Sequence, residues 1–291
     1  MAIASRGEPV SDRATNDHLD ERITDIRPRR GWAALRLGEL HEYRELLFFL
    51  VWRDVKVRYK QTALGVGWAV LQPVATMLVF TLCFGRLVRV PSNGVPYSLF
   101  SLAALVPWTF FANGIAQAST SILTNQQLVT KVYVPRLALP LATVLAGLMD
   151  MVIALIVLLG AMFWVGRVPG ADALWLIPLS LLAVAATLGV GLWLAASNVR
   201  YRDVKYVVPF LTQLWLFVSP VVYPATLVPE RWRSLYALNP MVGVVEGYRW
   251  ALFGGGPPLG LVASSCIGAL ALLWSGAMYF RRVERSFADI V

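Results

Sequence analysis

The chain has 291 residues, of which 57% are hydrophobic and 15% are charged, and its formal net charge is +9. Soluble domains carry about 25% charged residues, so this composition excludes an ordinary soluble protein and indicates an integral membrane protein. The basic balance would suit nucleic acid as well as a membrane surface, so the positions of the Lys and Arg residues have to decide between the two.

The first segment, residues 1–31, mixes acidic and basic residues and lacks the apolar core of a signal peptide. Such a composition buries too little apolar surface to fold, so we predict a disordered cytoplasmic tail. An interface region over 32–62 follows, and then a transmembrane domain over 63–291. The two His and two Cys residues are isolated from one another, which predicts neither a metal site nor a disulfide.

The region 32–62 contains a segment with helical periodicity. Apolar side chains recur at i, i+3, i+4, i+7 and i+11 with cations beside them, which predicts an amphipathic helix at the cytoplasmic membrane surface. The apolar stripe is Phe48, Val51, Trp52, Val55 and Tyr59, and the flanking cations are Arg53, Lys56 and Lys60. Two interpretations stay open: a simple membrane anchor, and a lever that meets a cytoplasmic partner.

Six apolar runs are long enough to cross a bilayer as helices, which predicts an all-α integral membrane protein with six spans. They lie near 66–87, 98–118, 137–165, 174–197, 207–223 and 259–280. The third run is long enough to tilt or break, and Pro140 near its start is the expected position. Between the fifth and sixth spans, segment 224–258 is rich in Pro and Gly, which predicts external re-entrant helices that enter the bilayer only partly.

An even number of spans places both termini on one side, and the positive-inside rule makes that side the cytoplasm. Most of the 26 Lys and Arg residues then lie inside, so the net charge is explained by anionic lipid head groups and no nucleic acid partner is expected. The tetrapeptide RDVK occurs at 53–56 and again at 202–205. Both copies are predicted to lie on the cytoplasmic face, directly before a span.

Few polar residues within the apolar segments suggest chemistry. Asp150 is the only acid in the six predicted spans, where an acid is either functional or a paired packing contact. Glu246 and Arg249 are three residues apart, which predicts an ion pair on the surface of a helix, with a substrate contact as the alternative. No paired acid and base and no Ser/His/Asp set is recognisable, so we expect no catalysis by this chain.

The chain contains 11 Trp and 10 Tyr residues, which suit either interfacial belts or stacking on sugar rings. Five aromatic residues within or near the spans are candidates for the lining of a conduit: Trp108, Phe111, Trp193, Trp215 and Phe217.

Four segments carry a resemblance to a known family: RDVKVRYKQTALGVGWAVLQP (53–73), KVYVPR (131–136), NVRYRDVKYVVPFLTQLWLFVSPVVYP (198–224) and NPMVGVVEGYR (239–249). In this order, over residues 40–285, the chain resembles the permease subunit of type-2 ABC exporters for cell-surface polysaccharides such as O-antigen, capsule and teichoic acid. The resemblance implies a homodimeric six-span permease in the bacterial inner membrane. Two copies of a separate ATPase would drive the export of a lipid-linked glycan.

The resemblance also implies roles for the polar segments. The interface helix would touch the ATPase through Arg53, Lys56, Arg58 and Lys60. Segment 125–136 would be the coupling helix, with Gln126, Gln127, Lys131, Tyr133 and Arg136. The cytoplasmic mouth would be formed by Arg200, Arg202, Asp203 and Lys205, and the external gate would include Glu246 and Arg249.

The sequence contains no GxxxxGK[ST] phosphate loop, so we expect no cofactor in this chain, with ATP and Mg²⁺ bound by the partner ATPase. Two other functions stay open. An exporter of drugs or small lipids would differ mainly in the width of its conduit. A membrane-embedded enzyme that modifies glycolipids would need a cluster of acids or His residues at a membrane face, which the sequence does not show.

Overall fold

The computed structural model describes residues 43–60, 65–131, 134–201 and 203–284. All described residues belong to one compact unit, which falls within Ala34–Val291. The predicted tail therefore lies outside the described residues. In the described part every regular element is a helix: α2 (Arg44–Lys60), α3 (Gly65–Phe80), η1 (Thr81–Leu87), α4 (Tyr97–Thr124), α5 (Gln126–Lys131), α6 (Ala138–Trp164), η2 (Ala171–Trp175), α7 (Leu176–Arg200), α8 (Val204–Val218), η3 (Ala225–Leu227), α9 (Glu230–Ala237), α10 (Pro240–Phe253) and α11 (Leu259–Glu284).

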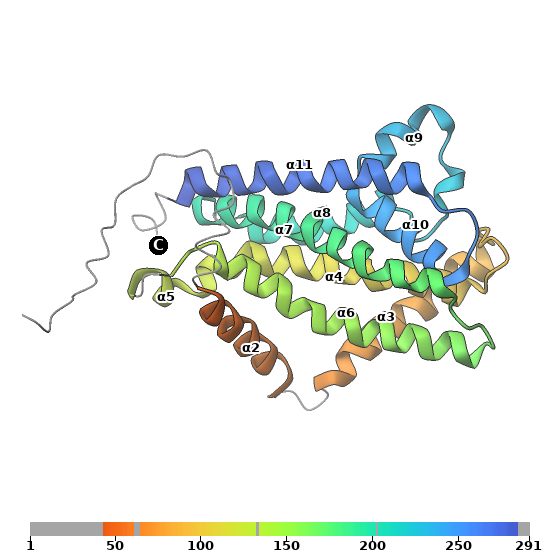
Figure 1. Cartoon of the computed structure of the whole chain (residues 1–291), viewed down its shortest axis with the longest axis horizontal. Helices are drawn as coiled ribbons and strands as arrows, with labels where there is room; N and C mark the ends of the chain where they lie inside the picture. The colour runs from red at the N-terminus through yellow and green to blue at the C-terminus, as the bar shows by residue number, and fades with distance from the viewer. Residues whose placement is uncertain (1–42, 61–64, 132–133, 202, 285–291) are drawn as a thin grey trace, which may run out of the picture. The chain divides into compact units, whose positions relative to one another are not determined.

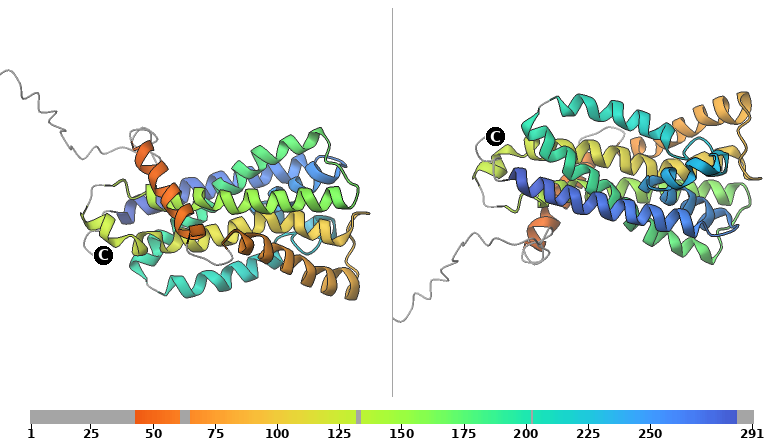
Figure 2. Two further views of the ribbon diagram at one scale, coloured as in Figure 1. Left: turned by 90° about the horizontal axis from the view of Figure 1, so that it is seen from below. Right: turned by 90° about the horizontal axis from the view of Figure 1, so that it is seen from above.

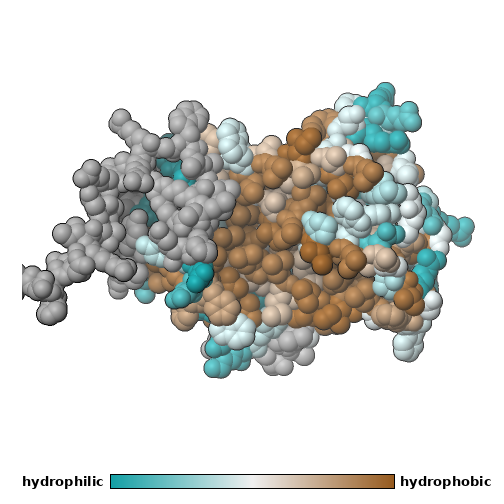
Figure 3. Space-filling model, viewed as in Figure 1, coloured by the Kyte–Doolittle hydropathy of each residue, from teal (hydrophilic) through white to brown (hydrophobic). Residues whose placement is uncertain are grey.

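Five of these segments are long and apolar enough to cross a membrane, so the chain is a multi-pass membrane protein. They are Gly67–Leu87, Tyr97–Thr124, Ala138–Trp164, Ala171–Arg200 and Leu259–Glu284. Each overlaps one predicted span, with ends that differ by at most six residues. The remaining predicted span corresponds to α8, which has 15 residues and is about 22 Å long, shorter than the roughly 30 Å hydrocarbon core. Apolar side chains cover the middle of the face drawn in Figure 3, and polar ones gather near α9.

Helix α4 is the centre of the bundle. It packs against α6 on one side and α7 on the other, and α7 in turn packs against α11 (Figure 1). Within their most apolar windows, 78% of the residues of α4 are buried, compared with 6% for the segment Gly67–Leu87. The first span therefore lies at the periphery of the chain, where its apolar side chains suit lipid or another protein surface.

Helix α6 is continuous from Ala138 to Trp164, so of the two possibilities given for this run, tilt or break, the break at Pro140 does not occur. The reason is the position of the proline. Pro140 lies in the first turn of α6, where the backbone N–H groups have no partner within the helix and a proline ring therefore removes no hydrogen bond.

The predicted interface helix is present as α2, and it is inclined to the long helices (Figures 1 and 2). Its apolar side chains do not form a single stripe. Leu50 is 2% exposed and packs on the core with Val51, whereas Phe48 is 70% exposed and Trp52 is 47% exposed. Because α2 packs against α6, one apolar face is used by the protein itself. The other face remains for a membrane surface or a partner.

The Pro- and Gly-rich segment before the last span forms the predicted pair of helices, α9 and α10. Asn239 caps α10, because its side chain accepts a hydrogen bond from the Met241 N–H at 3.1 Å, and Pro240 follows at the first helical position. Gly254, with a φ of 79°, ends the helix. Most residues of α10 are buried among α4, α7 and α11, whereas α9 is largely exposed.

Helices α7 and α11 approach each other closely because both carry glycine at the crossing. A Cβ added at Gly276 would collide with the carbonyl oxygen of Gly189, and one added at Gly189 would lie 2.6 Å from the backbone nitrogen of Leu273. Small residues at such crossings let helices in a membrane gain packing contacts.

Replacing Gly276 by Leu is therefore expected to lower the free energy of unfolding by about 2–3 kcal/mol and to reduce the amount of folded protein. Gly160→Leu is the matched control, since nothing lies within 4 Å of a Cβ added there. Thermal unfolding of both purified variants in one detergent tests the expectation. Equal melting temperatures would contradict the crossing described above.

Candidate functional site

The first candidate site is a polar cluster between α2 and α6. Arg58 donates a hydrogen bond and forms an ion pair with the Asp150 carboxylate, and Tyr59 donates its hydroxyl proton to the other oxygen of that carboxylate. The second Nη of Arg58 donates to the side-chain oxygen of Gln117 on α4. The lone acid of the predicted spans is thus paired, and it joins α2 to the bundle.

Asp150 lies twelve residues after Ala138, the first residue of α6, which places it about 18 Å along that helix. The side chains of Arg58 and Asp150 are 24% and 28% exposed. Burial, followed by the hydrogen bond to Asp150, raises the pKa of Tyr59, so its hydroxyl stays protonated and can donate. A cavity of about 20 Å³ adjoins the cluster, with room for about one water molecule.

Among the contacts that the structure resolves, the other cations of α2 contact only residues of the same helix. Arg53 pairs with its neighbour Asp54 at 2.8 Å. The Lys56 amino group lies 5.4 Å from the centre of the Trp52 ring, and Lys60 is exposed at the end of the helix. The resemblance gives a role to four cations of the interface helix. Of these four, Arg58 is the one that connects α2 with the bundle in the described part of the chain.

The second candidate site is the segment predicted as the coupling helix, 125–136, which contains the short helix α5. Gln126 and Gln127 are exposed on it. Arg136, just after α5, donates to the backbone carbonyl of Glu284, so the beginning of α6 is joined to the end of α11. The side chain of Lys131 and the whole of Tyr133 lie outside the described residues.

At the predicted cytoplasmic mouth, α7 ends at Arg200 and α8 begins at Val204. Arg200 and Lys205 each lie over the ring of the tyrosine that follows, at 5.5 and 4.8 Å from its centre. Asp203 immediately precedes α8 without capping it by its side chain, and Arg202 lies outside the described residues. The two RDVK copies therefore differ in structure, since the first lies inside α2 and the second lies at a helix junction.

The predicted pair of Glu246 and Arg249 is confirmed, with 3.0 Å between the carboxylate and the guanidinium. It is buried instead of lying on a helix surface, because the Arg249 side chain is 6% exposed and the Glu246 side chain 17% exposed. Burial lowers the pKa of Arg249 to about 10, against the opposing effect of Glu246, so the guanidinium remains charged near neutral pH.

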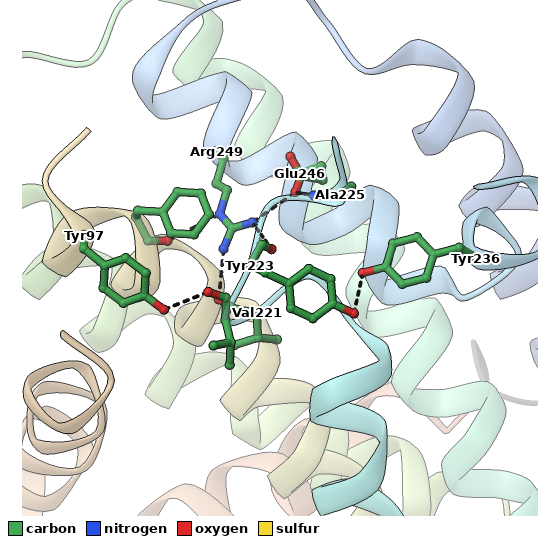
Figure 4. A network of polar contacts seen from close by, with 9 residues as sticks. Tyr97, Val221, Tyr223, Ala225, Tyr236, Glu246 and Arg249 are labelled. Atoms are coloured by element: carbon green, nitrogen blue, oxygen red, sulfur yellow. Dashed lines mark hydrogen bonds and ion pairs between the residues drawn. The ribbon is translucent and has the colours of Figure 1, made fainter. Parts of the chain in front are cut away.

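Arg249 connects three segments of the chain (Figure 4). It donates to the backbone carbonyls of Phe100, Val221 and Tyr223, at 3.4, 2.9 and 3.3 Å. Its guanidinium also lies 3.5 Å from the centre of the Phe100 ring. These contacts tie α10 to the first turn of α4 and to the loop after α8.

Further hydrogen bonds complete this network (Figure 4). Glu246 accepts from the Ala225 N–H at 3.0 Å, and Tyr97 donates to the Val222 carbonyl at 2.7 Å. Buried carbonyls without such donors would be costly. The segment between α8 and α9 has little helix of its own, and these side chains satisfy its backbone.

The five candidate conduit aromatics fall into two groups. Trp108 and Phe111 are buried inside the described chain, where Phe111 makes an edge contact with the half-buried Trp215, with 5.1 Å between ring centres. Trp193 is partly exposed and stacks on Tyr279 at 4.2 Å, and Phe217 is exposed. Their role in a conduit stays a prediction.

Sequence reasoning missed two contributors. Gln117 has no local signal that links it to α2, since 59 residues separate it from Arg58. Asn239 did carry a signal, because Asn followed by Pro is typical of a helix start. Its amide also accepts from the indole N–H of Trp215 at 3.1 Å and donates to Ser219 at 3.0 Å.

Comparison with known proteins gives consistent relatives. The family model described as ABC-2 type transporter matches residues 45–253. The O-antigen export system permease protein RfbA of Myxococcus xanthus is 33% identical over 260 residues, which cover 87% of this chain and 98% of that protein. RfbA of Klebsiella pneumoniae is 25% identical, covering 85% and 95%. The polysialic acid transport protein KpsM of Escherichia coli is 26% identical, covering 70% and 79%.

Proposed function

Because this chain belongs to the ABC-2 type transporter family, we propose that it is the permease of an exporter that moves a lipid-linked polysaccharide across the bacterial inner membrane. The chain is a transport subunit without a catalytic domain, and permeases of this family work with ABC ATPase subunits. The observation that carries the proposed cargo is the similarity to RfbA of Myxococcus xanthus, which extends over 98% of that permease.

The proposed assembly is a homodimer with two ATPase subunits, and both termini lie in the cytoplasm. This sidedness needs six crossings. Helix α8 supplies about 22 Å of the sixth, and the residues from Ser219 to Pro224 continue from it as turns and bends without forming a helix. ATP and Mg²⁺ would be bound by the ATPase, and closure of its two subunits would drive the conformational change of the permease.

The contacts of α2 support a path by which movement of the ATPase would be transmitted to the long helices. One side of α2 packs on α6 through Leu50 and the Arg58–Asp150 pair, while Lys56 and Trp52 face away from the bundle. An ATPase that binds the outer side of α2 and the exposed face of α5 would move both against the long helices. Different contacts in the two ATPase states would then shift the permease between closed and open conduits.

An exporter of drugs or small lipids is the second candidate. The inner membrane transport permease YadH of Escherichia coli, whose name specifies no polysaccharide, is 24% identical over 62% of this chain. The lower identity and the smaller share of the chain both favour the polysaccharide exporter. The alternative of a glycolipid-modifying enzyme does not agree with membership of a family of transport subunits.

Co-purification tests the proposal. The tagged chain is extracted from its native membrane in mild detergent, and we expect it to bring a separate ATPase subunit in equal amount. Replacing residues 125–136 by a Gly/Ser linker of equal length should remove that ATPase, or its stimulation, while the permease still inserts. Surface glycan should disappear when the gene is deleted and return with the wild-type chain. A chain that purifies alone, with surface glycan unchanged by the deletion, would refute the proposal.

A further inference from the structure

A large cavity in the described part of the chain lies at the end of the bundle that is opposite to α5. Its volume is about 980 Å³, at the upper end of the range for sites that bind small molecules. Its walls come from the loop before α4, from α9, from the end of α10, and from the first turns of α11. Figure 1 shows α9 and α5 at opposite ends of the long helices. If α5 is cytoplasmic, the cavity is external.

The largely buried Glu246 carboxylate in the wall of this cavity uses only one of its two oxygens for hydrogen bonds within the described chain. Glu246 accepts both of its hydrogen bonds, from Ala225 and Arg249, through one oxygen, Oε1. Within the described part of the chain, Oε2 accepts none, although the side chain is 17% exposed and lines the cavity. A carboxylate that is held by two donors through one oxygen, and whose other oxygen accepts no hydrogen bond beside a cavity, is a ready acceptor for a ligand hydroxyl.

The rest of the lining combines planar polar groups with aromatic faces. Trp250 and Phe253 are half-buried residues of the wall, and Trp250 is supported from behind by Trp175, with 5.8 Å between ring centres. Asn93 lies at the rim with its side chain exposed. The run Gly254–Gly256 has no Cβ atoms, so a ligand can approach its main chain closely.

The charged side chains that line the cavity are two acids and two arginines, so their charges cancel. Arg249 is paired with Glu246 at 3.0 Å, and the exposed Arg233 lies 4.0 Å from Glu230. A site for phosphate or for a strongly anionic group would show unmatched cations aimed at the ligand. A polyhydroxyl ligand instead needs a mixture of donors and acceptors, with apolar faces to cover its C–H groups.

We propose that this cavity binds sugar residues of the exported glycan on the external side of the membrane. Glu246 would accept a sugar hydroxyl through Oε2, and Trp250 would cover an apolar sugar face. The inference rests on the proposed function, since it takes its ligand from the exported polymer. Because α10 and the loop after α8 form the wall through Arg249, a bound glycan would contact the same network that holds the external end of the conduit.

A cavity-filling variant tests the proposal. Gly260 lines the cavity, and nothing lies within 4 Å of a Cβ added there, so Gly260→Trp should fill the space without moving the backbone. Ser234→Trp, on the exposed helix α9, is a second filling variant. Gly170→Trp is the matched control, because Gly170 is equally open but lies outside the lining.

The probe is a short oligosaccharide cut from the cell's own surface glycan, added to the purified permease–ATPase complex. Hydrogen–deuterium exchange is followed over residues 254–264. We expect exchange to slow by up to about tenfold at a concentration about ten times Kd in the wild type and in Gly170→Trp, and to be unchanged in both filling variants. Those variants should also lower surface glycan several-fold while ATPase binding remains.

Three results would overturn the inference: no protection in the wild type, equal protection in the filling variants, or protection by glycerophosphoethanolamine but not by the oligosaccharide. Failure of the proposed function looks different. In that case deletion of the gene leaves surface glycan unchanged, whereas failure of this inference alone leaves export intact and unaffected by Gly260→Trp.

Discussion

Arg249→Ala is expected to lower the free energy of unfolding by about 3–5 kcal/mol, the cost of removing one partner of a buried ion pair. The substitution leaves the Glu246 carboxylate without its cation. It also removes the donor to the carbonyls of Phe100, Val221 and Tyr223. Thermal unfolding in detergent, together with the yield of monodisperse protein, measures the loss.

A control variant and a rescuing double variant test whether the loss of stability comes from the buried ion pair. Arg231 is exposed on α9, with its guanidinium 5.9 Å from the Trp232 ring, so Arg231→Ala should cost less than about 1 kcal/mol. Replacing both members of the buried pair, Arg249→Met with Glu246→Leu, should recover part of the loss because no uncompensated charge remains. If Arg249→Ala melts at the same temperature as Arg231→Ala, the network does not hold the external segment.

Asp150→Ala is expected to reduce glycan export per ATP hydrolysed by about tenfold, corresponding to roughly 1.4 kcal/mol of coupling. The substitution takes away the acceptor shared by Arg58 and Tyr59, so α2 loses its polar attachment to α6. The ATPase should still bind and hydrolyse ATP. Export into proteoliposomes with simultaneous phosphate release gives the ratio directly.

A double-mutant cycle separates this attachment from general damage. Arg58→Ala and Asp150→Ala should be non-additive, since either one removes the same ion pair. Arg44→Ala is the matched control on the same helix, because Arg44 is exposed at its start and is not among the four cations expected to touch the ATPase. Additive losses from Arg58→Ala and Asp150→Ala, or an equal loss from Arg44→Ala, would show that the pair does not transmit force.

The helices were largely predictable because bilayer thickness sets their length and their composition. The apolar runs located five long segments and α8 to within six residues. The differences have local causes. Pro140 did not break α6 because it lies in the first turn, and α8 is shorter than its apolar run because the helix ends at Val218 and irregular backbone continues.

The sites were predictable only where the partners are neighbours in sequence. The spacing of Glu246 and Arg249 revealed their pair, but their burial depends on packing from α4 and the loop after α8. Asp150 stood out as a lone acid in an apolar segment. Its partner did not, because Arg58 lies 92 residues away on another helix and four cations of α2 were equally plausible.

The separation of Arg58 and Asp150 has a consequence for biogenesis. Ribosomes add about 5–20 residues per second, so about 5–20 seconds pass between the synthesis of α2 and that of its anchor. During this interval the first helix of the described chain has no Asp150 to bind, and it has to wait while the first two spans enter the bilayer. A nascent chain that stalls before Asp150 therefore carries an α2 without its polar attachment to α6.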